Sequence, residues 1–140
     1  MGRINLGRVI LGGLLTGLVI NTGEYLLNEV VFVHQLEEMV KRLNVTRPGG
    51  TFIAVAIIMT FLLGIVIVLI YAMIRTRFGP GPKTAIYAGM IGWFCVYVYA
   101  GVLNSVLFGL TPGLMLIGIL WGLVEYVLGA LAGAWFYKES

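Results

Sequence analysis

Four long apolar stretches constrain the fold of this chain more than any other feature. They cover about 9–33, 52–74, 84–107 and 112–137, and none has a Lys or Arg in its interior. A helix needs roughly 20 mostly apolar residues to cross a bilayer. We therefore expect an all-α, polytopic membrane protein. Its four transmembrane helices are predicted to form an antiparallel bundle, a single integral membrane domain covering 1–140.

The composition excludes several classes of function. Only 11% of the 140 residues are charged, whereas a soluble domain carries about a quarter. The basic residues lie at segment ends rather than on one face, which argues against nucleic-acid binding. All six acidic residues are Glu, and His34 and Cys95 are the single residues of their types. Motifs built on Asp, Cys pairs or His clusters are therefore missing, so we expect no enzyme, cofactor or metal site.

The connection between the first two stretches predicts a short amphipathic helix. Apolar residues recur at helical spacing, with charged residues on the other side: Leu36, Met39, Val40 and Leu43 against Glu37, Glu38, Lys41 and Arg42. Three placements remain open for this helix. It lies on the membrane surface, caps the bundle, or extends the first span as a solvated turn.

The distribution of Lys and Arg predicts the orientation. Cytoplasmic loops of membrane proteins carry an excess of these residues. One side of the predicted bundle holds Arg3, Arg8, Arg75, Arg77, Lys83 and Lys138, and the other holds Lys41, Arg42 and Arg47. We therefore expect both termini in the cytoplasm.

The first and fourth stretches carry matching stripes of glycine and polar residues. The stripes are Gly13, Gly17, Asn21, Glu24 and Asn28, and Gly118, Gly122, Glu125, Gly129 and Gly133. Each follows the spacing of one helix face. Small residues let membrane helices approach closely, and a carboxylate facing lipid is costly. The stripes predict that the first and fourth helices pack through Gly13, Gly17, Gly118 and Gly122, with both glutamates inside.

The two glutamates are expected to meet at similar depth. Glu24 lies 16 residues after Arg8 and Glu125 lies 13 residues before Lys138, which is about 24 Å and 20 Å along a helix. Two carboxylates in one dry site do not both ionise cheaply. At least one should be protonated, with hydrogen bonds to Asn21, Asn28, Tyr99 or the other Glu. The paired glutamates either stabilise the packing of the helices through hydrogen bonds or form a functional polar site.

Asn104 is expected at the outer interface of the membrane.

Several stretches of the sequence resemble small four-span bacterial inner-membrane proteins of uncharacterised function. The stretches are RVILGGL at 8–14, GLVIN at 17–21, FGPGPKTA at 78–85 and WGLVE at 121–125. The resemblance covers most of the chain. It implies a bacterial inner-membrane location, and it carries no activity and no site residues with it.

These patterns predict a non-enzymatic membrane protein, with the first of the following functions as the prediction and the other two as alternatives. The first is an accessory or structural subunit of a larger inner-membrane complex, or a homo-oligomer, with a membrane protein or a second copy as partner in the lipid bilayer. The second is a proton-coupled carrier of a small lipophilic compound that uses Glu24 and Glu125. The third is a pigment- or quinone-binding protein with a slot lined by Trp93, Tyr97 and Trp121.

Overall fold

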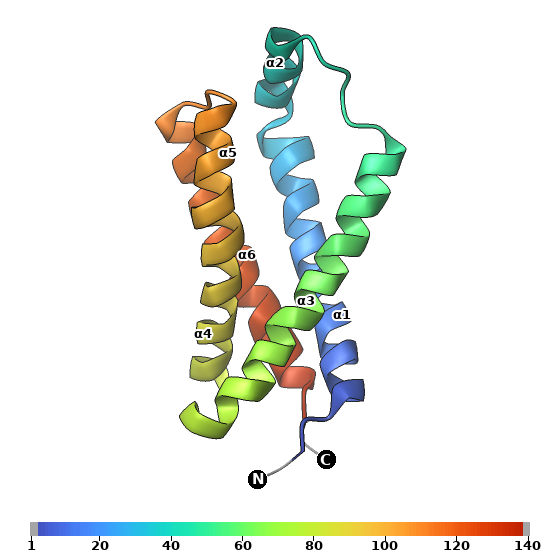
Figure 1. Ribbon diagram of the computed structural model, residues 1–140, viewed down its shortest axis with the longest axis vertical. Helices are drawn as coiled ribbons and strands as arrows, with labels where there is room; N and C mark the ends of the chain where they lie inside the picture. The colour runs from blue at the N-terminus through green and yellow to red at the C-terminus, as the bar shows by residue number, and fades with distance from the viewer. Residues whose placement is uncertain (1–2, 139–140) are drawn as a thin grey trace.

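The computed structural model describes residues 3–138, and this part of the chain is helical without strands. It contains four helical spans that are long and apolar enough to cross a membrane (Figure 1), namely Leu6–Val31, Gly50–Phe78, Pro82–Leu107 and Pro112–Phe136. The prediction of an all-helical protein with four spans is thereby confirmed. The predicted short helix between the first two spans is also present.

Two of the spans are not α-helical throughout. The elements in chain order are α1 (Leu6–Leu26), the π-helical segment η1 (Leu27–Val31), α2 (Val33–Leu43), α3 (Gly50–Phe78), α4 (Pro82–Trp93), the π-helical segment η2 (Phe94–Gly101), α5 (Val102–Leu107) and α6 (Pro112–Phe136). The first span therefore consists of α1 and η1, and the third of α4, η2 and α5. π-Helical turns are rare in proteins, and those that occur are often found at functional sites.

Local sequence signals set the helix ends. The side chain of Asn5 accepts a hydrogen bond from a backbone N–H of the first turn of α1, and Thr111 does the same for α6. Such caps satisfy amide groups that have no partner inside the helix. Asn44 ends α2 in the left-handed conformation at φ 51°. Gly79 and Gly81, with φ of 83° and 130°, make the turn from α3 to α4, where positive φ favours glycine.

The helices pack tightly at one end and separate at the other. α1 contacts α3 and α6, and α4 contacts α6 and α3. Figure 1 shows that α3 diverges from the third span, so that at the α2 end of the molecule it lies apart from α5. Residues 51–59, which form this end of α3, are all exposed. The buried core lies in the other half of the molecule and consists mainly of Val9, Ile67, Val68, Tyr71, Ala72, Ala85, Ala88, Tyr126, Ala130 and Tyr137.

The first glycine stripe packs against α3, and not against α6 as the sequence predicted. A Cβ atom on Gly13 would collide with the backbone of Ile65. On the facing helix, a Cβ on Gly64 would lie 2.6 Å from the amide nitrogen of Gly17. Gly13 and Gly17 therefore serve the close approach of the first and second spans, which is the small-residue packing typical of membrane helices.

α1 and α6 do pack together, through a different face of α1. A Cβ on Gly12 would lie 2.7 Å from the carbonyl oxygen of Gly133. The buried hydroxyl of Thr16 donates a 2.8 Å hydrogen bond to the carbonyl of Gly129. Neighbouring residues on an α-helix point about 100° apart. Gly12 and Gly13 therefore face two different helices, and a stripe drawn through only one of them identifies only one of the two contacts.

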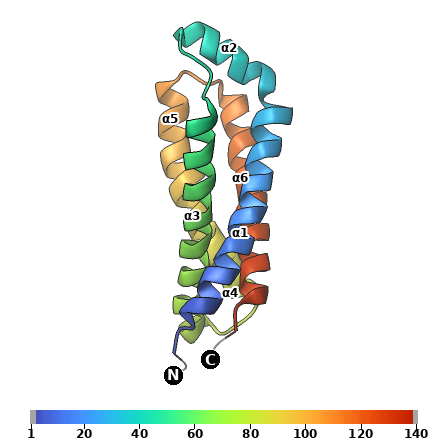
Figure 2. The ribbon, with the colours of Figure 1, turned by 90° about the vertical axis from the view of Figure 1, so that its right-hand side faces the viewer.

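Aromatic and basic side chains close the tightly packed end. The guanidinium of Arg8 lies 5.4 Å from the ring centre of Phe136. The guanidinium of Arg75 lies 5.7 Å and 5.2 Å from the ring centres of Tyr71 and Tyr137. The start of α1 and the ends of α3 and α6 therefore meet at this end, while α2 lies across the opposite one (Figure 2).

Candidate functional site

The hydroxyl of Tyr97 lies between the carboxyl groups of Glu24 and Glu125. It is 2.5 Å from Oε1 of Glu24 and 3.0 Å from Oε1 of Glu125. Three different spans supply these side chains: α1 carries Glu24, η2 carries Tyr97, and α6 carries Glu125. We call this group the carboxyl triad. The two glutamates that the sequence places at similar depth are linked here through one hydroxyl group.

The number of available protons shows how the triad is held together. A tyrosine hydroxyl has a single proton to donate, so only one of the two contacts can use it. The other contact needs a proton on a carboxyl group. Asn28 donates from Nδ2 to Oε2 of Glu24 at 3.2 Å, so both oxygens of Glu24 act as acceptors. Glu125 then carries the proton and donates it to the Tyr97 oxygen.

The burial of Glu125 supports the same assignment. Its residue is 5% exposed, and its Oε2 atom has no hydrogen-bond partner among the described residues. Burying an oxygen without a hydrogen bond costs much less free energy when the carboxyl group is neutral than when it is ionised. A Cβ on Gly23 would overlap with this oxygen, so the glycine makes room for the carboxyl group.

Glycine and tryptophan side chains fix the surroundings of the triad. A Cβ on Gly122 would overlap with the ring of Tyr97. The role expected for Gly122, packing against the first span, is therefore replaced by contact with the third. The indole nitrogen of Trp121 donates to the carbonyl of Gly23 at 3.1 Å, and that of Trp93 donates to the carbonyl of Ile119 at 2.8 Å. These bonds tie α6 to its two neighbours.

Both π-helical segments adjoin the triad. Tyr97 lies within η2, and Asn28, which contacts Glu24, lies within η1. A π-helical turn contains more residues than an α-helical turn, so it changes the direction in which the following side chains point. The directions in which Asn28 and Tyr97 point therefore depend on these two segments.

The remaining residues predicted for the polar site are only partly assembled. Asn28 joins Glu24, whereas Asn21 donates at 3.4 Å to the carbonyl of Ile57 in α3. Asn104 donates to the carbonyl of Ala100 at 2.9 Å and lines the cavity described below. The prediction for Tyr99 was wrong, because its side chain is 66% exposed and Tyr97 takes its place. The signal for Tyr97 was its helical spacing from Trp93.

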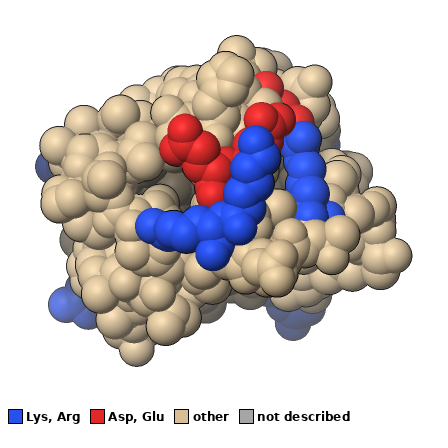
Figure 3. Space-filling view, turned by 90° about the horizontal axis from the view of Figure 1, so that it is seen from above, with Lys and Arg blue, Asp and Glu red and all other residues tan. Residues whose placement is uncertain are grey.

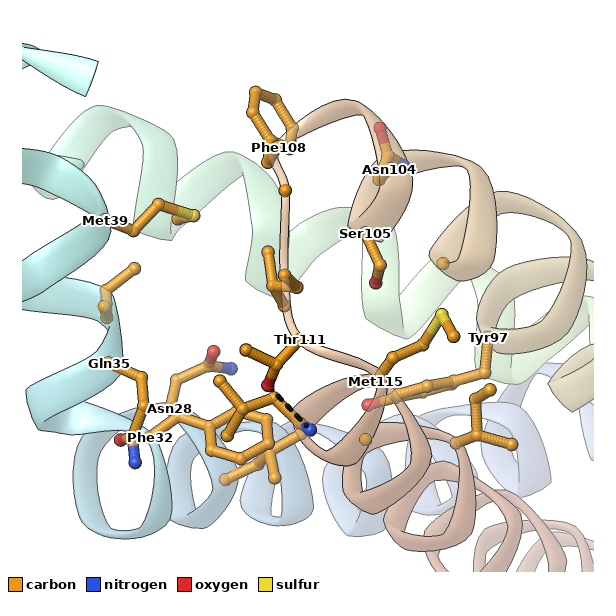
Figure 4. A pocket seen from close by; sticks show the side chains of 18 of the residues that line it. Asn28, Phe32, Gln35, Met39, Tyr97, Asn104, Ser105, Phe108, Thr111 and Met115 are labelled. Carbon is orange, nitrogen blue, oxygen red and sulfur yellow. Dashed lines mark hydrogen bonds between the residues drawn. The ribbon is translucent and has the colours of Figure 1, made fainter. Parts of the chain in front are cut away.

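A cavity of about 660 Å³ extends from the triad towards α2. It lies between η1, α2, the η2–α5 segment and the start of α6, and the side chains in Figure 4 show these walls. Glu24 and Tyr97 belong to its lining, as does Gly118. Its volume falls within the range of small-molecule sites, about 300–1,000 Å³.

α2 forms the roof of this cavity. Leu36 and Met39 contribute to its lining, which is the cap among the three placements left open by the sequence. Arg42 donates from Nη1 to the carbonyl of Gly109 at 3.4 Å and from Nη2 to the carbonyl of Phe108. α2 is thereby joined to the turn between α5 and α6. Figure 3 shows acidic and basic side chains gathered on this end of the molecule, beside a hollow.

A metal site has little support in this part of the structure. Within residues 3–138, no three side chains of His, Cys, Asp or Glu come together in a way that could hold a metal ion. The features that stand out are instead the cavity and the triad. Comparisons with protein-family models, with curated proteins and with solved structures gave no match, so the geometry of this site carries the functional argument.

Proposed function

We propose that this protein is a proton-coupled carrier of a small lipophilic compound. One observation carries the proposal: a cavity of about 660 Å³ ends on Glu24 and Tyr97, which connect directly to the buried Glu125. Ionisable groups inside a membrane protein commonly mark proton relays and substrate pathways. A ligand that reaches Glu24 therefore also reaches a group of side chains able to take up or release a proton.

The uneven packing of the molecule supports a carrier rather than an open pore. The cavity occupies the α2 end, whereas the opposite half is filled by the buried core, including Ile67, Tyr71 and Tyr126. Carriers give access to a site near the middle of the membrane from one side at a time. In the described conformation the cavity lies between the triad and the α2 roof, so the side of α2 is the side from which the site is reached.

The proposal includes a location and an orientation. The protein is an antiparallel four-helix bundle in a bacterial inner membrane, with both termini in the cytoplasm. The excess of Arg and Lys at the end that contains Arg8 and Arg75 supports this orientation. The cavity and its α2 roof then lie on the outer side of the membrane. The resemblance to small four-span inner-membrane proteins supports the bacterial location.

Reconstitution into liposomes tests this function. Vesicles containing the protein and an internal pH-sensitive dye should acidify or alkalinise when a transported compound is added on one side. Replacing Glu24 or Glu125 by Gln should abolish the proton signal, while Glu37→Gln, an exposed carboxyl group on α2, should leave it unchanged. Proton-linked transport that is equal in all four proteins would overturn the assignment of the triad.

A second candidate, an accessory subunit or homo-oligomer, is supported by α3. Its residues 51–59 are all exposed and almost entirely apolar, which gives a partner helix a surface to pack on. Particle mass in a mild detergent tests this candidate. A mass of one 15.3 kDa chain plus detergent, without any co-purifying protein, would exclude it.

A further inference from the structure

We infer that the ligand of this cavity is a monovalent organic amine that binds in its ammonium form, with its apolar body towards α2. This inference rests on the proposed function and names the substrate class of the same site. Three features of the cavity lead to it: the charges along its length, the free acceptor capacity at its floor and its apolar walls.

The charges favour a cation at the floor. Glu24 lies there, and the groups facing it are Tyr97 and Glu125 in the triad and Tyr126 on α6. None of these side chains is basic. Arg42 is the single basic residue among the described lining residues, and its guanidinium is occupied by the carbonyls at the roof. Glu38 adds a second acidic group on α2, so an ammonium group meets one acidic residue at the α2 end and another at the floor.

The floor has room for additional hydrogen-bond donors. Oε1 of Glu24 accepts from Tyr97, and Oε2 accepts from Asn28. Each carboxylate oxygen has about two acceptor sites, so an N–H group of a ligand can bind without displacing either partner. A bare metal ion is a poor alternative because it needs several converging oxygen or nitrogen ligands.

The walls suit an apolar ligand body. Phe32, Met39 and Met115 line the cavity between the floor and the roof (Figure 4). Aromatic and methionine side chains bury apolar groups of varied shape, because methionine adapts its conformation to them. Polar groups such as Asn104 and Ser105 occur on one wall, and Phe32 offers an aromatic surface to the ring of an aryl-alkyl amine.

Binding and proton release are then coupled through one carboxyl group. The Glu24 carboxylate holds either a proton or the ammonium ion R–NH₃⁺. A proton that binds there releases the ammonium ion to the medium, and an ammonium ion that binds there as an ion pair releases the proton. One positive charge enters the site and one leaves it, so the net charge is unchanged. The proton and the ammonium ion therefore compete for Glu24, and acidification weakens amine binding.

The test compares three ligands that share one skeleton. Native protein in phosphatidylcholine nanodiscs is titrated with 4-phenylbutylamine, 4-phenylbutanol and 4-phenylbutyrate at several pH values, with tryptophan fluorescence and calorimetry as readouts. The amine should bind at least about tenfold more tightly than the alcohol, because a buried charge-assisted pair adds more than a neutral hydrogen bond. Its affinity should fall with decreasing pH, whereas that of the alcohol should not. These measurements need no variant.

A variant then locates the effect. Glu24→Gln should remove the preference for amine over alcohol and its pH dependence, while Glu37→Gln should retain both. Equal binding of the three ligands, tighter binding of the butyrate, or no binding of the amine would overturn the inference. The liposome experiment decides separately on the proposed function: proton-linked transport of another compound together with a failed amine test would reject only the ligand class.

Discussion

The ring of Tyr97 rests on Gly122 so closely that a Cβ atom at this position would overlap with it. Tyr97 belongs to the third span and Gly122 to the fourth. Three residues after Gly122, the carboxyl group of Glu125 is hydrogen-bonded to the Tyr97 hydroxyl at 3.0 Å. The glycine thus sets the distance between two spans at the point where their polar groups meet.

Gly122→Ala should displace Tyr97 and disrupt the triad. A methyl group forced into a packed site costs about 1–3 kcal/mol, and here the displaced side chain carries the shared hydroxyl group. We expect a lower melting temperature in detergent and loss of the proton signal in liposomes. Gly113→Ala on the same helix is the matched control, because its Cβ would have no heavy atom within 4 Å. Equal effects of the two variants would contradict this account.

Tyr97→Phe should uncouple the two carboxyl groups while keeping the packing. The ring contact with Tyr126, whose centre is 5.6 Å away, does not involve the hydroxyl. Hydrogen bonds between membrane helices contribute only about 0.6 kcal/mol on average, so the melting temperature should change little. Proton-linked uptake should fall at least about tenfold, as expected for a lost proton-transfer group. Tyr99→Phe, on a side chain that is 66% exposed, should behave like the native protein.

Arg42→Ala should loosen the roof of the cavity. The guanidinium of Arg42 bonds to the carbonyls of Phe108 and Gly109, and α2 contains no buried residue. Few apolar contacts therefore replace the lost bonds. Backbone amides of α2 should exchange with deuterium faster in the variant, and ligand should enter and leave faster. Lys41→Ala, on the neighbouring position, is the control. Unchanged exchange in Arg42→Ala would show that α2 is held by other contacts.

Gly13→Ala should separate the first and second spans. The added methyl group would meet the backbone of Ile65, which cannot rotate away as a side chain can. Overpacking of this kind costs about 1–3 kcal/mol, visible as a lower unfolding midpoint in detergent. Gly113→Ala is the control because its Cβ would have no heavy atom within 4 Å. A native midpoint for Gly13→Ala would argue against the close contact of α1 with α3.

The sequence alone predicts much of the architecture. The four spans and the helix at Val33–Leu43 follow from hydropathy and from helical spacing, since both signals are long or strongly periodic. The inward position of Glu24 and Glu125 follows from the cost of a carboxylate in lipid. Each of these predictions rests on a property of one segment, without reference to its neighbours.

The partners of each segment are much harder to predict. Gly12 and Gly13 are adjacent glycines that serve two different interfaces, and composition does not show which interface belongs to which neighbour. Tyr97 and Tyr99 are two tyrosines in one apolar run, and only the packing of η2 against α6 decides between them. Choosing correctly requires the angular position of each residue relative to another helix, which depends on the whole assembly.

The π-helical segment η2 has a consequence for how this site is encoded. Its eight residues, Phe94–Gly101, wind more slowly than an α-helix, so every side chain after them is rotated relative to those before. The direction of Tyr97 is therefore determined by how many residues the segment contains as well as by which residues they are. A deletion of one residue that preserves every functional side chain would still turn this hydroxyl group away from its two carboxyl partners.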